Sequence, residues 1–233
     1  MSPLPYRREK STADEVEGLL AKVGTNRRAG GGGTLLTEPV IVVRGMHRDP
    51  LELLDQNGRK LGSANPRPLV DWSYEPSYEL CETDGRCVLM VRKLSRSFRG
   101  RLKGTWAYEL FDPGDPRTIT VSCAERWRKK QDTYRIEREG FDPWPSSATV
   151  REGPHQIGLL RSGAGRCLCS IQDEPGHILG RVLLARQQFL DRFALVVEVE
   201  NRTPDQLHKV AVAASVIADR EMLASGGGGA AGA

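Results

Sequence analysis

Residues 210–218 read Val-Ala-Val-Ala-Ala-Ser-Val-Ile-Ala, a block that is apolar on every side of a helix except at Ser215. A helix that is apolar all round is either buried in a protein core or inserted in a membrane. These nine residues span only about 13 Å at the helical rise, whereas the core of a bilayer is about 30 Å thick. Charged residues follow at once, from Asp219 to Glu221. The block therefore predicts a buried core helix, and its small side chains suit a helix enclosed by a sheet.

The flanking residues predict where this helix begins and ends. Thr203 is a favourable N-cap, Pro204 suits the first helical position, and Gln206 completes a capping box. A run of glycines then ends the pattern. We expect the helix to run to about Ala224 and to be followed by a flexible Gly/Ala tail at residues 225–233.

Upstream of the helix, the pattern changes to short runs of β-forming residues separated by turn residues. Many short strands at such spacing, in strand–turn–strand order, predict a largely antiparallel sandwich or barrel. With the core helix, the pattern predicts a mainly β fold whose helix can sit inside a closed sheet. We assign this domain to residues 35–224, after an N-terminal tail at residues 1–34. The runs are Val40–Val43, Leu51–Leu54, Tyr78–Glu82, Cys87–Arg92, Thr105–Phe111, Thr118–Cys123, Thr133–Glu137, Gln156–Leu160, Cys167–Ile171, Ile178–Leu184 and Phe193–Val199.

A weak internal repeat marks several of the turns. Asp55-x-x-Gly58-x-x-Leu61-Gly62 recurs as Asp173-x-x-Gly176-x-x-Leu179-Gly180, and Glu82-x-x-Gly85-x-x-Val88 is a looser copy. In each, the acid caps the turn, glycine supplies a positive φ, and the apolar residue returns to the core. The repeat therefore predicts hairpins and not a nucleotide-binding site.

The N-terminal tail contains a short amphipathic helix, predicted at residues 12–23. Thr12 and Glu15 match a capping box, and the Gly-rich stretch 27–33 is typical of a flexible linker. The helix either docks on the main domain or engages a protein partner. Its apolar face consists of Val16, Leu19, Leu20 and Val23.

Several motifs occur in a fixed order along residues 39–221. They are Gly176-His-Ile-Leu-Gly-Arg181, Asp191-Arg-Phe-Ala-Leu-Val-Val-Glu198, the block from Leu207 to Asp219, Val91-Arg-Lys-Leu-Ser95, Gly104-Thr-Trp106 and Leu54-Asp-Gln-Asn-Gly58. Together they resemble the Tubby C-terminal-like superfamily, in particular its phospholipid scramblase and LURP-one-related branches. The resemblance implies a mainly β fold, a closed antiparallel barrel of about 12 strands around a buried hydrophobic C-terminal helix. It also implies affinity for phospholipid headgroups. Scramblases also carry a calcium segment, for which Glu200-Asn-Arg-Thr-Pro204 has too few oxygen ligands.

The charges of the chain are unevenly distributed. It holds 34 Lys and Arg against 30 Asp and Glu, a net charge of +4. Residues 86–103 hold seven cations and no acid, and residues 126–138 hold six cations and two acids, so the rest of the chain carries −7. This asymmetry favours a basic surface that meets phosphate groups on lipid or nucleic acid. A solvated face that keeps the protein soluble is the alternative.

The basic runs are the best candidates for a binding site. A basic loop with apolar side chains, here Leu94, Phe98 and Leu102, suits an anionic membrane surface, where each cation contributes about 1 kcal/mol. Arginine also pairs with nucleic-acid phosphates, and Trp127 and Tyr134 favour stacking on bases, but no RNP, KH or helix-turn-helix pattern accompanies them. The predicted headgroup-binding residues are Arg92, Lys93, Arg96, Arg99, Arg101, Lys103, Arg126, Arg128, Lys129 and Lys130.

Sequence motifs of catalytic and metal sites are missing. There is no GxSxG, no P-loop and no GxGxxG after a strand. The four histidines and five cysteines lack zinc-ligand spacing, and Cys167 and Cys169 should point to one face of a strand. We expect reduced structural cysteines, no catalytic residue, no metal and no cofactor, in a reducing cytoplasm or at its membrane surface. A secretory signal or a transmembrane segment is not expected.

The functional expectation is therefore a non-enzymatic domain that binds anionic phospholipid headgroups or another membrane-proximal ligand. Two alternatives remain open at this stage. One is a protein-interaction scaffold or regulatory module that uses the helix at residues 12–23, and the other is a nucleic-acid binder that uses the basic runs.

Overall fold

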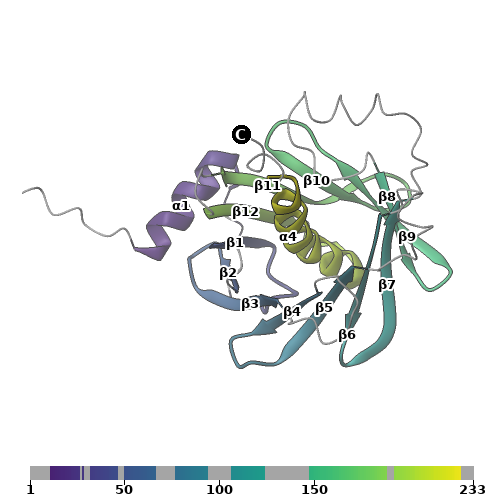
Figure 1. Ribbon diagram of the computed structural model, residues 1–233. Helices are drawn as coiled ribbons and strands as arrows, with labels where there is room; N and C mark the ends of the chain where they lie inside the picture. Colours follow the sequence, from purple (N-terminus) through teal and green to yellow (C-terminus); the bar gives the residue numbers. More distant parts are fainter. Residues whose placement is uncertain are drawn as a thin grey trace, which may run out of the picture.

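Twelve antiparallel strands and one central helix form the main body of the chain (Figure 1). The structure is a computed structural model, and it describes residues 11–26, 28, 32–46, 50–66, 77–93, 106–123, 147–187 and 192–226. Within these ranges, the strands close into a barrel and the helix lies inside it. The predicted fold class is confirmed.

The strands follow one another around the barrel in sequence order, and the first pairs with the last. Every neighbouring pair is antiparallel, as expected for a meander. Because the number of strands is even, the barrel closes with β1 and β12 also antiparallel. The bounds are β1 Val40–Met46, β2 Leu51–Asp55, β3 Lys60–Pro66, β4 Ser77–Glu82, β5 Cys87–Lys93, β6 Trp106–Asp112, β7 Asp115–Cys123, β8 Ser147–Glu152, β9 His155–Ser162, β10 Cys167–Gln172, β11 Ile178–Gln187 and β12 Arg192–Val199.

Two of these strands, β3 and β8, were not among the runs predicted from sequence. β3 contains Gly62, Asn65 and Pro66, residue types that are rare in strands. A Cβ at Gly62 would lie 2.2 Å from the backbone oxygen of Cys81 on β4, so only glycine permits this close approach. The run predicted at Thr133–Glu137 lies outside the described residues.

Helix α4, Asp205–Gly226, fills the barrel (yellow in Figure 1). Its block from Val210 to Ala218 is buried throughout, with no side chain more than 2% exposed, which confirms the predicted core helix. The hydroxyl of Ser215 donates to the carbonyl of Val212 at 2.7 Å, so the polar residue in the block is satisfied within the helix. Burial of one Ile or Val side chain contributes about 1.5–3 kcal/mol to stability.

The predicted N-terminus of this helix is wrong by one residue. The first helical hydrogen bond runs from the amide of His208 to the carbonyl of Pro204, at 3.0 Å, so Pro204 occupies the cap position. The hydroxyl of Thr203 instead donates to the carbonyl of Leu179 at 3.0 Å and ties the connection to β11. The side chain that the local pattern predicted as the helix cap therefore bonds to a neighbouring strand instead.

Helix α1, Thr12–Val23, packs on the outside of the barrel against β11 and β12. Val16, Leu19 and Leu20 are buried in a second apolar cluster that covers the outer wall (also containing Val40, Val42, Leu54, Leu183, Ala185, Ala194 and Val196). The capping box is formed by Ser11 and Asp14, one residue earlier than the predicted Thr12 and Glu15. The carboxylate of Glu15 instead forms an ion pair with the guanidinium of Arg44 on β1, at 2.6 Å.

The repeated turn formula forms three hairpins of the same design, as predicted. In each, the amide of the leading acid donates to the carbonyl four residues later, at 2.9–3.1 Å. The glycines have φ values of 82° at Gly58, 86° at Gly85 and 94° at Gly176, in the region that L side chains rarely adopt. The acids also pair with a base at the end of each turn: Asp55 with Arg59, Glu82 with Arg86 and Asp173 with His177.

The prediction that Cys167 and Cys169 share one face is wrong. The pairing of β10 with β11 shifts between these two residues, which marks a bulge. Cys169 therefore points into the barrel core, while Cys167 packs with the outer cluster under α1.

Candidate binding site at one end of the barrel

The alternation of strand direction divides the connections between two ends of the barrel. Connections that follow even-numbered strands lie at one end, where α4 also begins, and those that follow odd-numbered strands lie at the other. The first set consists of tight turns, each led by an acidic residue, and we call this end the acidic end. These acids are Asp55, Glu82, Asp112, Glu152, Asp173 and Glu200.

Five of these acids hold their own connection, whereas Glu152 pairs with Arg117 of β7 at 3.5 Å. Asp55, only 2% exposed, accepts from the amides of Asn57 and Arg59 at 2.8 and 2.9 Å. Asp112 accepts from the amide of Gly114 and from the ammonium of Lys209, at 2.8 and 2.9 Å, and thereby links the β6–β7 turn to α4. The acidic end is therefore built as a structural rim of the barrel.

Both predicted basic runs connect at the other end of the barrel. Residues 94–105 link β5 to β6, and residues 124–146 link β7 to β8. These four strands are consecutive neighbours, with Lys93 opposite Tyr108 and Trp106 opposite Cys123. The points where the two basic segments leave the barrel thus lie side by side, and we call this end the basic end.

The predicted site residues fall mostly within those two segments. Arg96, Arg99, Arg101, Lys103, Arg126, Arg128, Lys129 and Lys130 lie outside the described residues. Lys93 is the last residue of β5, beside the point where the first segment begins. The structure therefore fixes where these cations attach to the barrel.

Two cations of the 86–103 run have acidic partners in the structure. Arg92 of β5 pairs with Glu109 of β6, with its Nε 3.1 Å from the carboxylate, and its guanidinium lies 5.8 Å from the centre of the Phe111 ring. Arg86 pairs with Glu82 at 2.5 Å, at the acidic end. Both partners precede or follow the basic run in sequence, so a count over the run overstates the charge available to a ligand.

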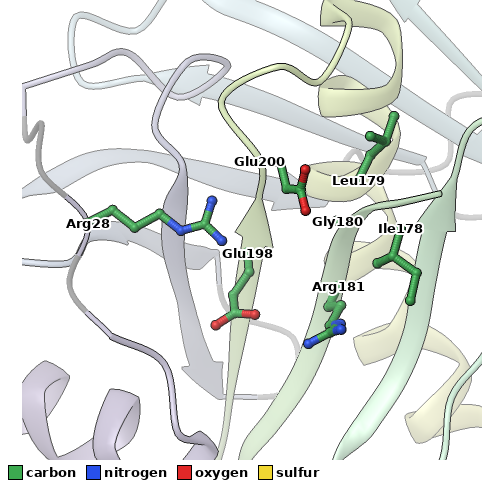
Figure 2. Close-up of a pocket in the computed structure, with 7 residues that line it drawn as sticks. All are labelled: Arg28, Ile178, Leu179, Gly180, Arg181, Glu198 and Glu200. Atoms are coloured by element: carbon green, nitrogen blue, oxygen red, sulfur yellow. The ribbon is translucent and has the colours of Figure 1, made fainter.

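A shallow pocket of about 110 Å³ lies on the outer wall, where the chain leaves α1 and crosses β11 and β12 (Figure 2). Figure 2 shows the guanidinium of Arg28 directed toward Glu198 and Glu200. Arg28 donates to the carbonyl of Val199 at 2.5 Å. Because the lining combines the cations Arg28 and Arg181 with two acids, its charges balance and it does not favour an anionic ligand.

Two buried titratable residues, Glu38 and His208, lie close together near the start of α4. Glu38 is fully buried, and its carboxylate accepts from the amide of Gly33 at 3.1 Å. The ring of His208, 7% exposed, bonds the backbone carbonyl of Glu38, and burial lowers the pKa of this histidine to about 4. Oε1 of Glu38 and Nε2 of His208 lack a hydrogen-bond partner among the described residues.

Sequence analysis did not single out either residue. For His208 a signal existed, because it lies four residues before Val212 and so shares a helical face with the buried block. For Glu38 no local pattern signals burial, since it sits in the connection before β1.

The described residues contain neither a metal-binding cluster nor a membrane-spanning helix. No group of three or more His, Cys, Asp or Glu side chains there could hold a metal ion. Of the helices in those ranges, neither has the length and apolar content that crossing a bilayer requires.

Comparison with known proteins gives little further guidance. No protein-family model and no curated protein matches the chain. Among solved structures, an X-ray structure of a protein from Arabidopsis thaliana is similar with a TM-score of 0.42 and 12% sequence identity, over 83% of this chain and 99% of that one. The functional argument therefore rests on the residues of this chain.

Proposed function

We propose that this chain is a non-enzymatic binding domain that uses its basic end to bind anionic phospholipid headgroups at a membrane surface. The observation that supports the proposal is the attachment of both basic segments to consecutive strands at one end of the barrel. Turns led by acids lie at the opposite end. A membrane with a negative surface potential would attract the end that carries the basic segments.

The composition of the two segments suits a lipid surface. Residues 96–103 contain four cations and residues 126–130 contain another four, without an acid in either stretch. Phe98, Leu102 and Trp127 lie among them and supply side chains that can enter the headgroup region. The resemblance to scramblase and LURP-one-related proteins supports the same ligand class.

The alternative use of α1 as a protein-binding segment has less support. The apolar face of this helix is already buried against the outer wall of the barrel. Arg44 pairs with Glu15, and Arg166 donates to the carbonyl of Lys22 at 2.5 Å, so both ends of the helix are tied to strands or their connections. A partner would have to displace α1 before it could bind this face.

Vesicle flotation tests the proposal. Wild-type protein should float with phosphatidylcholine vesicles that contain phosphatidylserine, and not with phosphatidylcholine alone. The triple variant Arg96→Ser, Arg99→Ser, Arg101→Ser removes three cations worth about 1 kcal/mol each, so its affinity should fall about 100-fold. Binding by the wild type should weaken as salt rises.

A matched control carries the same change in charge at the acidic end. Arg86, Arg117 and Arg202 are exposed there, with 66%, 60% and 70% of their side chains accessible. Their replacement by serine should leave vesicle binding near the wild-type level. Equal loss in both triple variants, or unchanged binding in the first, would contradict the proposal. Binding to an oligonucleotide but not to vesicles would favour the nucleic-acid alternative.

A further inference from the structure

Two cysteines face each other across the hairpin formed by β4 and β5. The Cα atoms of Cys81 and Cys87 are direct partners in the antiparallel register. The amide of Glu82 donates to the carbonyl of Arg86 at 2.9 Å, so the next pair along the ladder is a position without backbone hydrogen bonds. In a regular ladder the Cα atoms at such positions are about 4.5 Å apart, which lies within the range that disulfides span, about 4.4–6.8 Å. The register shifts between Leu80 and Cys81, so this pair lies beside a bulge.

The side chains of this pair are placed to react. Both cysteines are free and half-buried, so small reagents can reach them. Burial raises the pKa of the Cys87 thiol, and the neighbouring Cys81 adds to the shift through its charge and a side-chain hydrogen bond. In the reduced protein the sulfur of Cys81 accepts from the side-chain amide of Asn65 at 3.6 Å, and the thiol of Cys87 donates to the carbonyl of Leu89 at 3.8 Å. The raised pKa lowers the thiolate fraction of Cys87 at neutral pH, so its reaction with an oxidant is slower than that of an exposed cysteine.

We propose that Cys81 and Cys87 form a reversible disulfide when the protein meets a peroxide or a small disulfide such as oxidised glutathione. With hydrogen peroxide, one sulfur is first oxidised to a sulfenic acid and a water leaves. The second thiol then attacks that sulfur, the S–S bond forms, and its proton leaves with the hydroxyl as a second water. Two thiols lose two electrons in total, and one peroxide is reduced to two waters.

The hairpin geometry also favours reversal. Only the turn from Glu82 to Arg86 lies between the two cysteines, so the disulfide closes a short loop and gains little from restricting the unfolded chain. An accessible disulfide with little added stability is readily reduced by cellular thiols. Cys169 offers a contrast, because it is fully buried in the barrel and its neighbour Cys167 points to the opposite face.

Thiol counting on the full-length protein tests this assignment. Reduced protein has five cysteines; after treatment with oxidised glutathione or hydrogen peroxide, two thiols should disappear and return on addition of dithiothreitol. Trypsin cleaves after Arg86, between the two cysteines, so a disulfide would join two tryptic peptides that separate on reduction. Detection of this joined pair by mass spectrometry identifies the bond.

Single serine variants supply the controls. Cys81→Ser and Cys87→Ser should each abolish the joined peptide, whereas Cys167→Ser should leave it unchanged. The proposal is overturned if wild-type protein keeps all its thiols under oxidant that fully oxidises dithiothreitol. It is also overturned if the two thiols that disappear belong to another pair, or if Cys81→Ser loses two thiols as readily as the wild type.

Discussion

His208 should make the stability of the fold depend on pH below neutrality. Its pKa is lowered from 6.5 to about 4 by burial, so the folded protein resists a proton that the unfolded chain accepts. Stability is therefore complete above pH about 6.5 and is lost as the pH falls toward 4. A shift of this size is worth about 3 kcal/mol at pH about 4. Only 7% of the residue is exposed, so solvent screening is small.

Urea unfolding at several pH values, followed by tryptophan fluorescence or circular dichroism, measures this effect. His208→Asn keeps a side-chain donor for the carbonyl of Glu38 and cannot titrate. The free energy of unfolding of the wild type, relative to this variant, should fall by about 3 kcal/mol between pH about 7 and about 4. His155→Asn, at an exposed turn of the same end, controls for the loss of an imidazole. A constant difference between wild type and His208→Asn across this range would refute the reasoning.

Three further predictions concern the fold. Ile217→Ala empties part of the core around α4 and should lower the free energy of unfolding, measured by chemical denaturation, by about 2–5 kcal/mol. Ile217→Asp buries an unpaired charge, so circular dichroism should show an unfolded domain. Gly62→Ala should lower the melting temperature strongly, since its Cβ would lie 2.2 Å from the Cys81 carbonyl oxygen. Ser11→Ala removes the N-cap of α1 and should cost about 1 kcal/mol, seen as faster amide exchange in that helix.

The parts of the fold that were predicted from sequence depend on local chemistry. The core helix is recognisable because its apolar block is too short for a bilayer and too apolar for a surface. The three repeated hairpins are recognisable because the acid and the glycine act within five residues. The sequence-based predictions were wrong where contacts with another strand decide the local structure. The hydroxyl of Thr203 bonds to the carbonyl of Leu179 instead of capping α4. A bulge in the pairing of β10 with β11 turns Cys167 outward.

In the candidate site, too, some features were predictable from sequence and others depend on the fold. The number of cations can be read from the sequence. Whether a cation is free to bind a ligand depends on strand register, because the register determines which acids it faces. Arg92 meets Glu109 only because β5 and β6 align Arg92 opposite that residue. Likewise, the facing of Cys81 and Cys87 follows from the hairpin register, which the residue types alone do not determine.

The direction of α4 matches the placement of the acid-led turns at one end of the barrel and of the basic segments at the other. The helix begins at the acidic end, next to Glu200, and its N-terminus carries a partial positive charge that carboxylates stabilise. Its C-terminus, with a partial negative charge, points to the end where the basic segments attach. Tight turns suit the first end because the backbone of α4 must be anchored there, as the pairing of Lys209 with Asp112 illustrates. Longer connections, residues 94–105 and 124–146, occur at the second end, away from the start of α4.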